Sequence, residues 1–314
     1  MGRVFSVFLL TIAIFGFFFL RSREEFSVAS PLSKKSDNQK QVVKNTWFPK
    51  KTADVNYSDL ALSAKSAILV DYDSGEVIYA RNSGDKLPAA STIKIMTALV
   101  ALAEGNLSDI YKVSERSNSV GENSMGLSAG EKLTLEELLY GLMLVSGNDA
   151  AVTIAEGTSG SEDEFVNLMN EYVSYLGLKN TRFVNATGLD DDNKAQFSSA
   201  YDMVTIAHYV WEKYPVFGKI TSTYNKFIEG NEDHKAFDLY NDTNLLTTYP
   251  GVGGIKPGFT WEAGLCLVTY AENDGKKLLA VILGSDDRRG AMKELLDYGF
   301  ASYGILVSHP ALDL

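Results

Sequence analysis

The chain has 314 residues, of which 45% are hydrophobic, enough for one large globular core or two smaller ones. Its formal net charge of -11 and the lack of a basic stripe with interleaved aromatic residues disfavour nucleic acid as a partner. A single cysteine, Cys266, excludes an intrachain disulfide framework.

The first segment with a clear pattern is Val4 to Leu20, an uncharged apolar run that would reach about 26 Å as a helix. It could be a membrane anchor or the core of a signal peptide. The triplet Ser27-Val28-Ala29 offers a cleavage site, but it follows four charged residues. We therefore favour an N-terminal membrane anchor over residues 1–22, with a cleaved signal segment as the alternative. In either case we expect the rest of the chain on the extracytoplasmic side of the membrane.

Residues 23–57 are polar, rich in serine and lysine and without sustained periodicity, as is typical of a flexible linker. Stronger patterns begin at about residue 58, so we assign one folded domain to residues 58–306 and a short tail to residues 307–314. The domain opens with a strand, a turn and a strand between Ala67 and Ala80. An Asp-x-Asp pair in that turn lacks a closing glutamate, which favours a hairpin turn over a calcium loop.

Helix patterns occupy the middle of this domain. They are Ser91–Glu104, a helix opened by the capping box Thr134-x-x-Glu137, a helix opened by Ser161-x-x-Glu164 and ended at Gly177, and Ser199–Lys213 before Pro215. A second hairpin with its turn at Asn273-Asp274-Gly275 and a last helix at about Asp287–Tyr303 follow. Strands at both ends and helices between them predict an α+β fold. Both hairpins would join one antiparallel β-sheet that is flanked by helices and covered by the last one.

Few residues could carry out chemistry. Three histidines occur without HExxH, a Cys/His cluster or a G-x-S-x-G elbow, so metal-dependent hydrolysis and a Ser-His-Asp triad lack their parts, and we expect no metal and no cofactor. The pattern S-x-x-K occurs as Ser83-Gly-Asp-Lys86 and as Ser91-Thr-Ile-Lys94. The first lies in a turn, whereas the second opens an apolar helix on which positions i and i+3 share a face. Ser91 and Lys94 are therefore the candidate nucleophile and base.

Lys94 can accept the proton of Ser91 only when its amine is neutral. Lowering a lysine pKa from about 10.4 toward 7 takes about 4 to 5 kcal/mol, which burial and a second nearby cation could supply. Lys256 is the candidate for that cation. Ser146 and Asn148, in the triplet SGN at the break between two helical runs, offer a second hydroxyl and an amide.

Three ordered motifs and their flanks stand out between about residues 58 and 304: AASTIKIMTALV, ENSMGLSAGEKLTLEELLYGLMLVSGNDAA, LGLKNTRFVNATGLDD, SSAYDMVTIA, NLLTTYPGVGGIKPGFTWEAGLCLV and ELLDYGF. Together they resemble the low-molecular-weight penicillin-binding proteins, the serine-type D-Ala-D-Ala carboxypeptidases of peptidase family S11. The resemblance implies a DD-peptidase/β-lactamase-like fold with an all-helical subdomain, and it makes residues 58–306 the catalytic domain.

The resemblance also implies the reaction. The carbonyl of the penultimate D-alanine of a peptidoglycan stem peptide would acylate Ser91, the terminal D-alanine would leave, and water would release the acyl chain. Lys94 would be the base, and Ser146, Asn148 and Lys256 would form the proton relay and the substrate-binding wall. β-Lactam antibiotics would be covalent inhibitors, and the cytoplasmic membrane would be a partner through the N-terminal segment.

Other parts of the substrate site follow from the same resemblance. Gly258 and Phe259 would contact the substrate, and the amides of Ser91 and Phe259 would form the oxyanion hole. Counting back from ELLDYGF, the carboxylate-binding arginine falls on Arg288, with Arg289 as the alternative.

Pro257 departs from the family pattern, which has threonine or serine at this position. A proline has neither a hydroxyl nor an N–H, so it removes one contact to the terminal carboxylate of the substrate. An edge strand could accommodate it with its nitrogen turned away from the neighbouring strand. Thr260 could not replace the hydroxyl, because its side chain would lie on the other face of the strand. We therefore expect a weaker preference for a free terminal carboxylate.

Alternative functions remain open. A DD-endopeptidase that cuts peptidoglycan cross-links would share all of these residues. A β-lactamase of class A would need a deacylating glutamate, which LGLKNTRFVNATGLDD does not offer. A peptidoglycan-binding pseudoenzyme is disfavoured because Ser91, Lys94 and Lys256 are all present.

Overall fold

The computed structural model of the protein describes residues 45–50, 60–191, 195–243 and 245–310, all of which belong to the unit Ser36–Leu314. The anchor or signal segment predicted over residues 1–22 lies outside the described residues, as does most of the linker predicted over residues 23–57. Among the described residues, no helix is both long enough and apolar enough to cross a membrane.

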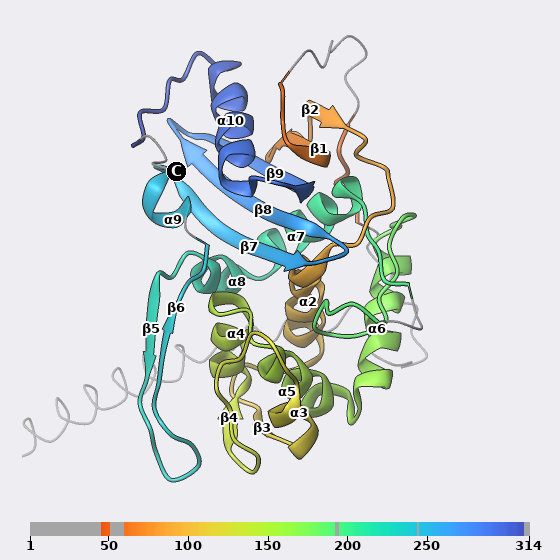
Figure 1. The fold of residues 1–314 in the computed structure, drawn as a ribbon, viewed down its shortest axis with the longest axis vertical. Coiled ribbons are helices and arrows are strands. Elements are labelled where there is room, and N and C mark those ends of the chain that lie inside the picture. Colours follow the sequence, from red (N-terminus) through yellow and green to blue (C-terminus); the bar gives the residue numbers. More distant parts are fainter. Residues whose placement is uncertain (1–44, 51–59, 192–194, 244, 311–314) are drawn as a thin grey trace, which may run out of the picture. The chain divides into compact units, whose positions relative to one another are not determined.

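A five-stranded antiparallel sheet has the strand order β2-β1-β9-β8-β7 (Figure 1). Its strands are β1 (Ala64–Asp71), β2 (Val77–Arg81), β7 (Val252–Thr260), β8 (Gly264–Asn273) and β9 (Lys276–Ser285). The β1–β2 hairpin comes from the start of the domain and the β8–β9 hairpin from its end, and the pairing of β1 with β9 joins them. The prediction that both hairpins share one antiparallel sheet is confirmed.

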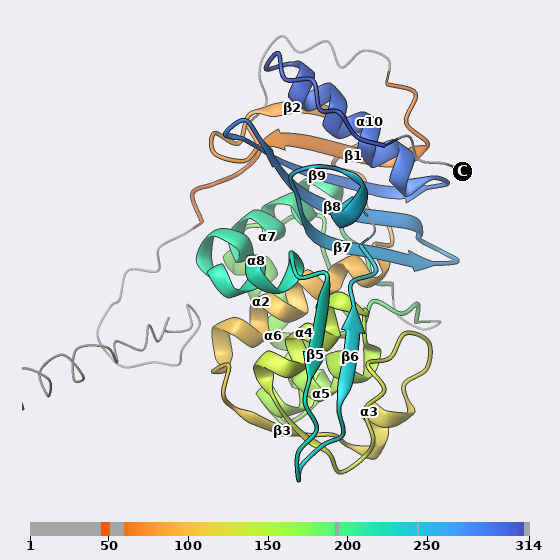
Figure 2. The same cartoon turned by 90° about the vertical axis from the view of Figure 1, so that its left-hand side faces the viewer.

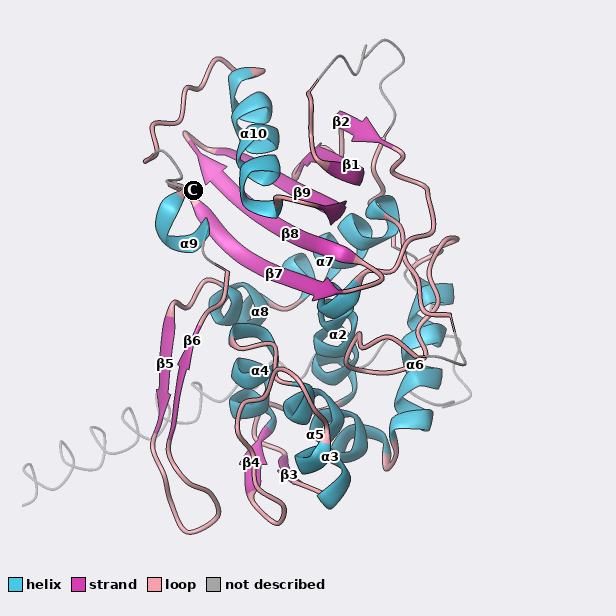
Figure 3. Ribbon diagram, in the orientation of Figure 1, coloured by secondary structure: helices cyan, strands magenta, loops and turns pink. Residues whose placement is uncertain are grey.

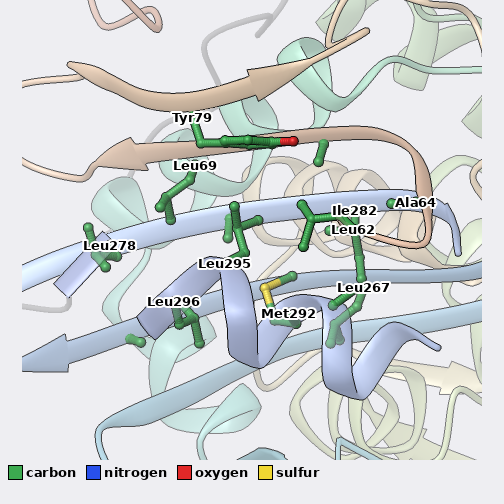
Figure 4. Packing of buried hydrophobic residues seen from close by; sticks show 14 of the residues in the cluster. Leu62, Ala64, Leu69, Tyr79, Leu267, Leu278, Ile282, Met292, Leu295 and Leu296 are labelled. Carbon is green, nitrogen blue, oxygen red and sulfur yellow. The ribbon is translucent and has the colours of Figure 1, made fainter. Parts of the chain in front are cut away.

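Helices cover both faces of the sheet: α10 (Arg288–Ala301) packs on one face and α7 (Ala200–Lys213) on the other (Figure 2). The central strand β9 is buried on both faces, which is why it appears in the sequence as a continuous apolar run. Ile282 of β9 packs in one cluster with Met292 and Leu295 of α10 (Figure 4). The last helix therefore covers the sheet, as predicted.

The other helices gather in a layer beside the sheet (Figure 3). They include the 3-10 helix η1 (Ala90–Ile93), α2 (Lys94–Glu104), α3 (Glu115–Ser119), α4 (Leu135–Leu144), α5 (Asn148–Ser159) and α6 (Glu162–Tyr175). The capping box at Thr134 opens α4, and the Ser161 hydroxyl accepts a hydrogen bond at the start of α6, as predicted. The α+β class with a helical subdomain is confirmed. The helix predicted from Ser91 differs only in its first turn, which is 3-10.

Several short elements have no clear sequence pattern. They are β3 (Ile110–Lys112), β4 (Lys132–Thr134), α3, α8 (Pro215–Thr221), β5 (Asn225–Ile228), β6 (Phe237–Tyr240) and α9 (Leu245–Thr248). Strands of three or four residues are too short for alternation to show. Pro215, which ends one helix pattern, also begins α8, because the first helical position needs no N–H donor.

Residues 45–50, predicted as part of the linker, lie against the folded domain. The indole of Trp47 stacks on the His208 ring, with 3.7 Å between the ring centres, and its Nε1 donates a hydrogen bond to the Tyr72 carbonyl. The Tyr201 hydroxyl donates to the carbonyl of Pro49. Residues 45–50 of the predicted linker are therefore fixed to the domain by stacking and hydrogen bonds.

Candidate active site

The candidate site lies where strand β7 meets the helix η1, which directly precedes α2. Gly258 makes this approach possible, because a Cβ at that position would lie 2.9 Å from the Ser91 nitrogen. Ser91 itself is partly exposed, so a substrate can reach it. The preceding residue, Ala90, has φ +48°, a left-handed conformation that is strained for a residue with a side chain. The backbone at the candidate nucleophile is thus held in an unusual conformation by close packing.

Lys94 contacts Ser91 directly. The side chain of Lys94 is fully buried, and its Nζ lies 2.9 Å from Ser91 Oγ, 2.8 Å from Asn148 Oδ1 and 2.5 Å from the Thr187 carbonyl oxygen. A neutral amine has two N–H donors and one lone pair. Since the amide oxygen and the carbonyl can only accept, they take both donors and leave the lone pair for the hydroxyl of Ser91.

The two acceptors around Lys94 are themselves fixed. Asn148 Nδ2 donates to the Gly121 carbonyl at 2.9 Å, which orients its Oδ1 toward the lysine. Asn185 Oδ1 accepts hydrogen bonds from the Thr187 and Gly188 amides, and its Nδ2 donates to the Leu189 carbonyl. This turn presents the Thr187 carbonyl to Lys94.

Burial and charge both act on Lys94. Burial is the largest cause and the nearby Lys256 ammonium the next, and together they hold the pKa of Lys94 well below its ordinary value. Asp242 opposes this by raising the pKa. From the sequence we expected burial and a second lysine to act in this way, and both contributions are present. A lysine with a lowered pKa has a lone pair available at a lower pH.

Lys256 is fully buried, but its surroundings differ. Among the described residues its Nζ has no hydrogen-bond partner, and it approaches Asp242 Oδ1 only to 3.8 Å. Burial lowers the pKa of Lys256, Asp242 opposes this effect, and Arg288 adds to it. An ammonium that is buried without hydrogen bonds is costly unless a ligand completes its contacts.

Ser146 lies in the connection between α4 and α5 and is 2% exposed, with φ +59°. Such a conformation is costly for a serine and is most often found at functional sites. No hydrogen bond joins its Oγ to another of the described residues, so the structure does not link it to Lys94 or Lys256. The structure thus connects Ser91, Lys94 and Asn148, and leaves Ser146 outside this network.

Arg288 and Arg289 begin α10, but they point to different surroundings. Arg288 Nη1 donates to the Gly258 carbonyl at 3.1 Å, and burial lowers the pKa of its half-buried guanidinium. Arg289 is exposed, and its backbone N–H bonds to the side chain of Asp287. The geometry therefore favours Arg288 over Arg289 as the arginine beside strand β7.

Pro257 pairs with Leu267 of β8, and β7 is an edge strand of the five-stranded sheet. An edge strand tolerates proline because one side of it needs no ladder donor, so the expected accommodation of Pro257 is confirmed. Thr260 donates a hydrogen bond to Asp190 Oδ1, whereas Leu267, opposite Pro257, lies in the cluster under α10. The two side chains are thus on opposite faces of β7, as expected.

Two open clefts lie beside the candidate site, and both are lined in part by Leu189 and Asp190. One has a volume of about 370 Å³ and is lined by Ala89, Ala90 and Gly188 among others. The other has a volume of about 450 Å³ and includes Phe259, which is 45% exposed, and Trp261. Residues next to Ser91 and Gly258 in the chain thus line the two clefts, whereas Ser91 itself lines neither. Over the residues that the structure describes, no group of three His, Cys, Asp or Glu side chains could hold a metal ion.

Some functional groups of this site could not be named from the sequence. The Thr187 oxygen is a backbone atom, so no residue type marks it. Asn185 forms a sequon with Thr187, but its side chain is used for the turn instead. Asp242 is one acid in a polar stretch and becomes notable only through its contact with Lys256.

Comparisons with known proteins agree with this geometry. Residues 51–287 match the profile of the family Peptidase_S11, described as D-alanyl-D-alanine carboxypeptidase. The chain is 42% identical over 254 residues to D-alanyl-D-alanine carboxypeptidase DacF of Bacillus subtilis, covering 78% of this chain and 64% of that protein. It is 35% identical over 257 residues to DacA of Escherichia coli, covering 76% of this chain and 61% of the relative. The chain therefore matches less than two thirds of the length of these relatives.

Solved structures give the same result. The Streptomyces K15 DD-transpeptidase has a TM-score of 0.73 and 28% identity, covering 78% of this chain and 99% of that one. A D-alanyl-D-alanine carboxypeptidase from Mycobacterium tuberculosis has a TM-score of 0.72 and 32% identity, covering 79% of this chain and 94% of that one. The fold of the described domain is therefore that of the DD-peptidases.

Proposed function

Since the chain belongs to the D-alanyl-D-alanine carboxypeptidase family, peptidase S11, we propose that it removes the terminal D-alanine from peptidoglycan stem peptides through an acyl-enzyme on Ser91. One observation carries the proposal. Lys94 Nζ lies 2.9 Å from Ser91 Oγ, while acceptors occupy its other two contacts. In that arrangement the neutral amine can only accept the proton of the serine hydroxyl.

The proposed reaction consists of acylation of Ser91 followed by hydrolysis of the acyl-enzyme. Lys94 takes the proton of Ser91 as Oγ bonds to the carbonyl carbon of the penultimate D-alanine. The C–N bond breaks, and the proton passes to the amine of the leaving D-alanine, with Ser146 as the proposed relay. A water molecule then attacks the ester carbon and gives its proton to Lys94. The ester bond between that carbon and Ser91 Oγ breaks, and Lys94 returns the proton to Oγ.

The charge that develops on the carbonyl oxygen needs donors. The amides of Ser91 and Phe259 are the proposed oxyanion hole, and the packing of Gly258 on Ser91 supports it by bringing the two backbones together. Asn148, Lys256, Gly258, Phe259 and Arg288 form the proposed substrate-binding wall. The Lys256 ammonium supports this role, because it has no hydrogen-bond partner among the described residues and a substrate group could supply one.

The relatives and the solved structures also support where the enzyme acts. Penicillin binding protein 5 from Haemophilus influenzae, which is 33% identical with a TM-score of 0.70, supports β-lactams as covalent inhibitors of Ser91. We propose an extracytoplasmic location for the domain at residues 58–306, since its stem-peptide substrate belongs to the cell wall. We also propose that residues 1–22 tether this domain to the membrane through the linker at residues 23–57. Residues 307–314 are proposed to be a short tail after the domain.

A DD-endopeptidase is the second candidate, and Pro257 is the observation that favours it. The substrate of a carboxypeptidase ends in a free carboxylate, and Pro257 provides no hydroxyl to bind it. A cross-link cut by an endopeptidase lies inside the peptide network instead.

The test uses the full-length chain and a peptide that ends in D-Ala-D-Ala. We expect mass spectrometry to show loss of one D-alanine and, with penicillin, an adduct on Ser91. Ser91→Ala should remove both. Ser83→Ala, in the other S-x-x-K, should change neither, because Ser83 lies in a loop outside the site.

Other products would point elsewhere. Conversion of cross-linked dimers to monomers in digested peptidoglycan, without loss of terminal D-alanine, would favour the endopeptidase. Fast turnover of penicillin instead of a lasting adduct would indicate a β-lactamase. If labelled penicillin failed to attach and Ser91→Ala made no difference, the pseudoenzyme interpretation would replace the proposal.

A further inference from the structure

Asp242 lies in the short connection between β6 and α9, at the edge of the candidate site. The residues on either side of it hold the connection in place. Asn241 Nδ2 donates to the carbonyls of Thr221 and Thr223, and its Oδ1 accepts from the Thr243 amide. The Asp242 amide itself bonds to the carbonyl of Leu144. The aspartate is therefore carried on a fixed backbone.

The side chain of Asp242 points toward the cations of the site. Its Oδ1 lies 3.8 Å from Lys256 Nζ, and the carboxylate is 36% exposed while the lysine is fully buried. The charge of Asp242 also acts on Lys94 and Arg288, and raises the pKa of both against the effect of burial. One aspartate thus lies near Lys256, and its charge acts on all three basic residues of the candidate site.

These cations are the groups that could bind a carboxylate on the leaving residue of the substrate. Lys256 Nζ is buried and without a hydrogen-bond partner in the described structure, and Arg288 lies beside Gly258. If Lys94 is neutral, Lys256 and Arg288 contribute two positive charges and Asp242 removes one. A carboxylate that accepted a hydrogen bond from Lys256 would come close to Asp242, and like charges at such a distance repel.

Pro257 acts in the same direction for a different reason. Pro257 has no hydroxyl that could donate a hydrogen bond to the carboxylate of the leaving residue, whereas the charge of Asp242 repels that carboxylate. Arg288 also donates to a backbone carbonyl in the structure, so it would have to divide its donors between that contact and a ligand. Three features of one subsite therefore weaken the binding of a free carboxylate.

We propose that Asp242 is a specificity-determining residue that weakens the binding of a free carboxylate on the leaving residue, and so lowers the advantage of free-acid D-Ala-D-Ala peptides over peptides whose leaving residue is amide-capped or internal. The inference rests on the proposed function, because it assigns the leaving-group preference of the acyl-enzyme reaction at Ser91.

The experiment compares two peptides that differ in one group, an acyl-D-Ala-D-Ala free acid and its C-terminal amide. The full-length chain is compared with Asp242→Asn, which keeps the shape and removes the charge. We expect kcat/KM to rise about 10-fold on the free acid and to change less than about 2-fold on the amide, since a tenfold change corresponds to about 1.4 kcal/mol of repulsion. Asp238→Asn is the matched control, because it removes an exposed acid from strand β6. It should alter neither value.

A repulsive charge should also be screened by salt because Asp242 is partly exposed. The gain of Asp242→Asn over the unaltered chain on the free acid should therefore shrink as the ionic strength rises, while the two stay alike on the amide. This readout would not move if the aspartate only supported the fold.

The outcomes separate the inference from the proposed function. An equal change on both peptides, or no change on either, would overturn the role of Asp242 while acylation of Ser91 by penicillin still supported the reaction. A fall on both peptides would mean that the aspartate assists catalysis instead, and would overturn the inference as well. If neither peptide were cleaved and penicillin left Ser91 unmodified, the proposed function would fail, and the inference with it.

Discussion

Lys94 and Lys256 differ in their hydrogen bonding, although both are fully buried and burial lowers the pKa of each. Lys94 Nζ has three oxygen atoms within 2.9 Å. Lys256 Nζ has no hydrogen-bond partner among the described residues, and approaches Asp242 only to 3.8 Å. The part of the site that would perform the chemistry is therefore complete without a substrate, whereas the part that would bind it is open.

The difference follows from the elements that carry each lysine. Lys94 begins a buried helix, and its acceptors are held by further hydrogen bonds to Gly121 and Asn185. A change there would leave a buried polar group unpaired. Lys256 belongs to an edge strand, beside Pro257 and an exposed aspartate. An edge strand tolerates substitution more easily than a buried helix. We therefore expect the surroundings of Lys94, the first region, to determine the reaction, and the surroundings of Lys256, the second region, to determine the substrate preference.

The largest effect should come from the first region. Lys94→Met keeps a buried, unbranched side chain but has no amine, so acylation of Ser91 should fall about 10³-fold or more. The rate of adduct formation with labelled penicillin measures this. Lys86→Met is the control, since Lys86 lies in the other S-x-x-K and is exposed. Equal losses in the two variants would contradict the assignment of Lys94 as the base.

A smaller effect is expected at Asn148, an acceptor of Lys94. Asn148→Asp places a negative charge beside the amine, which favours the protonated lysine and raises its pKa. Acylation at neutral pH should therefore fall about 10- to 100-fold and recover as the pH is raised. Asn148→Ala removes the acceptor and adds no charge, whereas the aspartate still accepts, so recovery at high pH should be specific to the aspartate. A pH dependence identical in the two variants would contradict this account of Lys94.

The smallest effect belongs to the second region. Pro257→Thr supplies a hydroxyl in the leaving-residue subsite and should raise kcat/KM on a free-acid D-Ala-D-Ala peptide about 2- to 5-fold. Pro257→Val has nearly the same shape without the hydroxyl and should give no such gain. An unchanged or lower value for the threonine variant would count against a recognition role for this position.

Much of the fold could be predicted from the sequence because local signals and periodicity agree. The caps at Thr134 and Ser161 mark helix starts, and the turn at Asn273 to Gly275 marks the second hairpin. The short strands β5 and β6 could not be predicted, since four residues cannot establish alternation and their pairing spans a loop.

The candidate site also contains residues that could be predicted from the sequence and one that could not. Ser91 and Lys94 could be paired because both lie near the start of one helix, where a spacing of three residues keeps them on one face. Asn148 and Lys256 could be assigned through the family resemblance. Asp242 could not, because its meaning depends on a contact between a loop and a strand that only the folded chain creates.

One measurement tests most directly whether Lys94 acts as a neutral base. It is the rate at which penicillin acylates Ser91, followed across pH in the unaltered chain. Protonation removes the lone pair of Lys94, so the rate should fall as the pH drops through the pKa of this lysine. The account predicts that this limb lies well below the ordinary lysine value of about 10.4. A limb at the ordinary lysine value would contradict it.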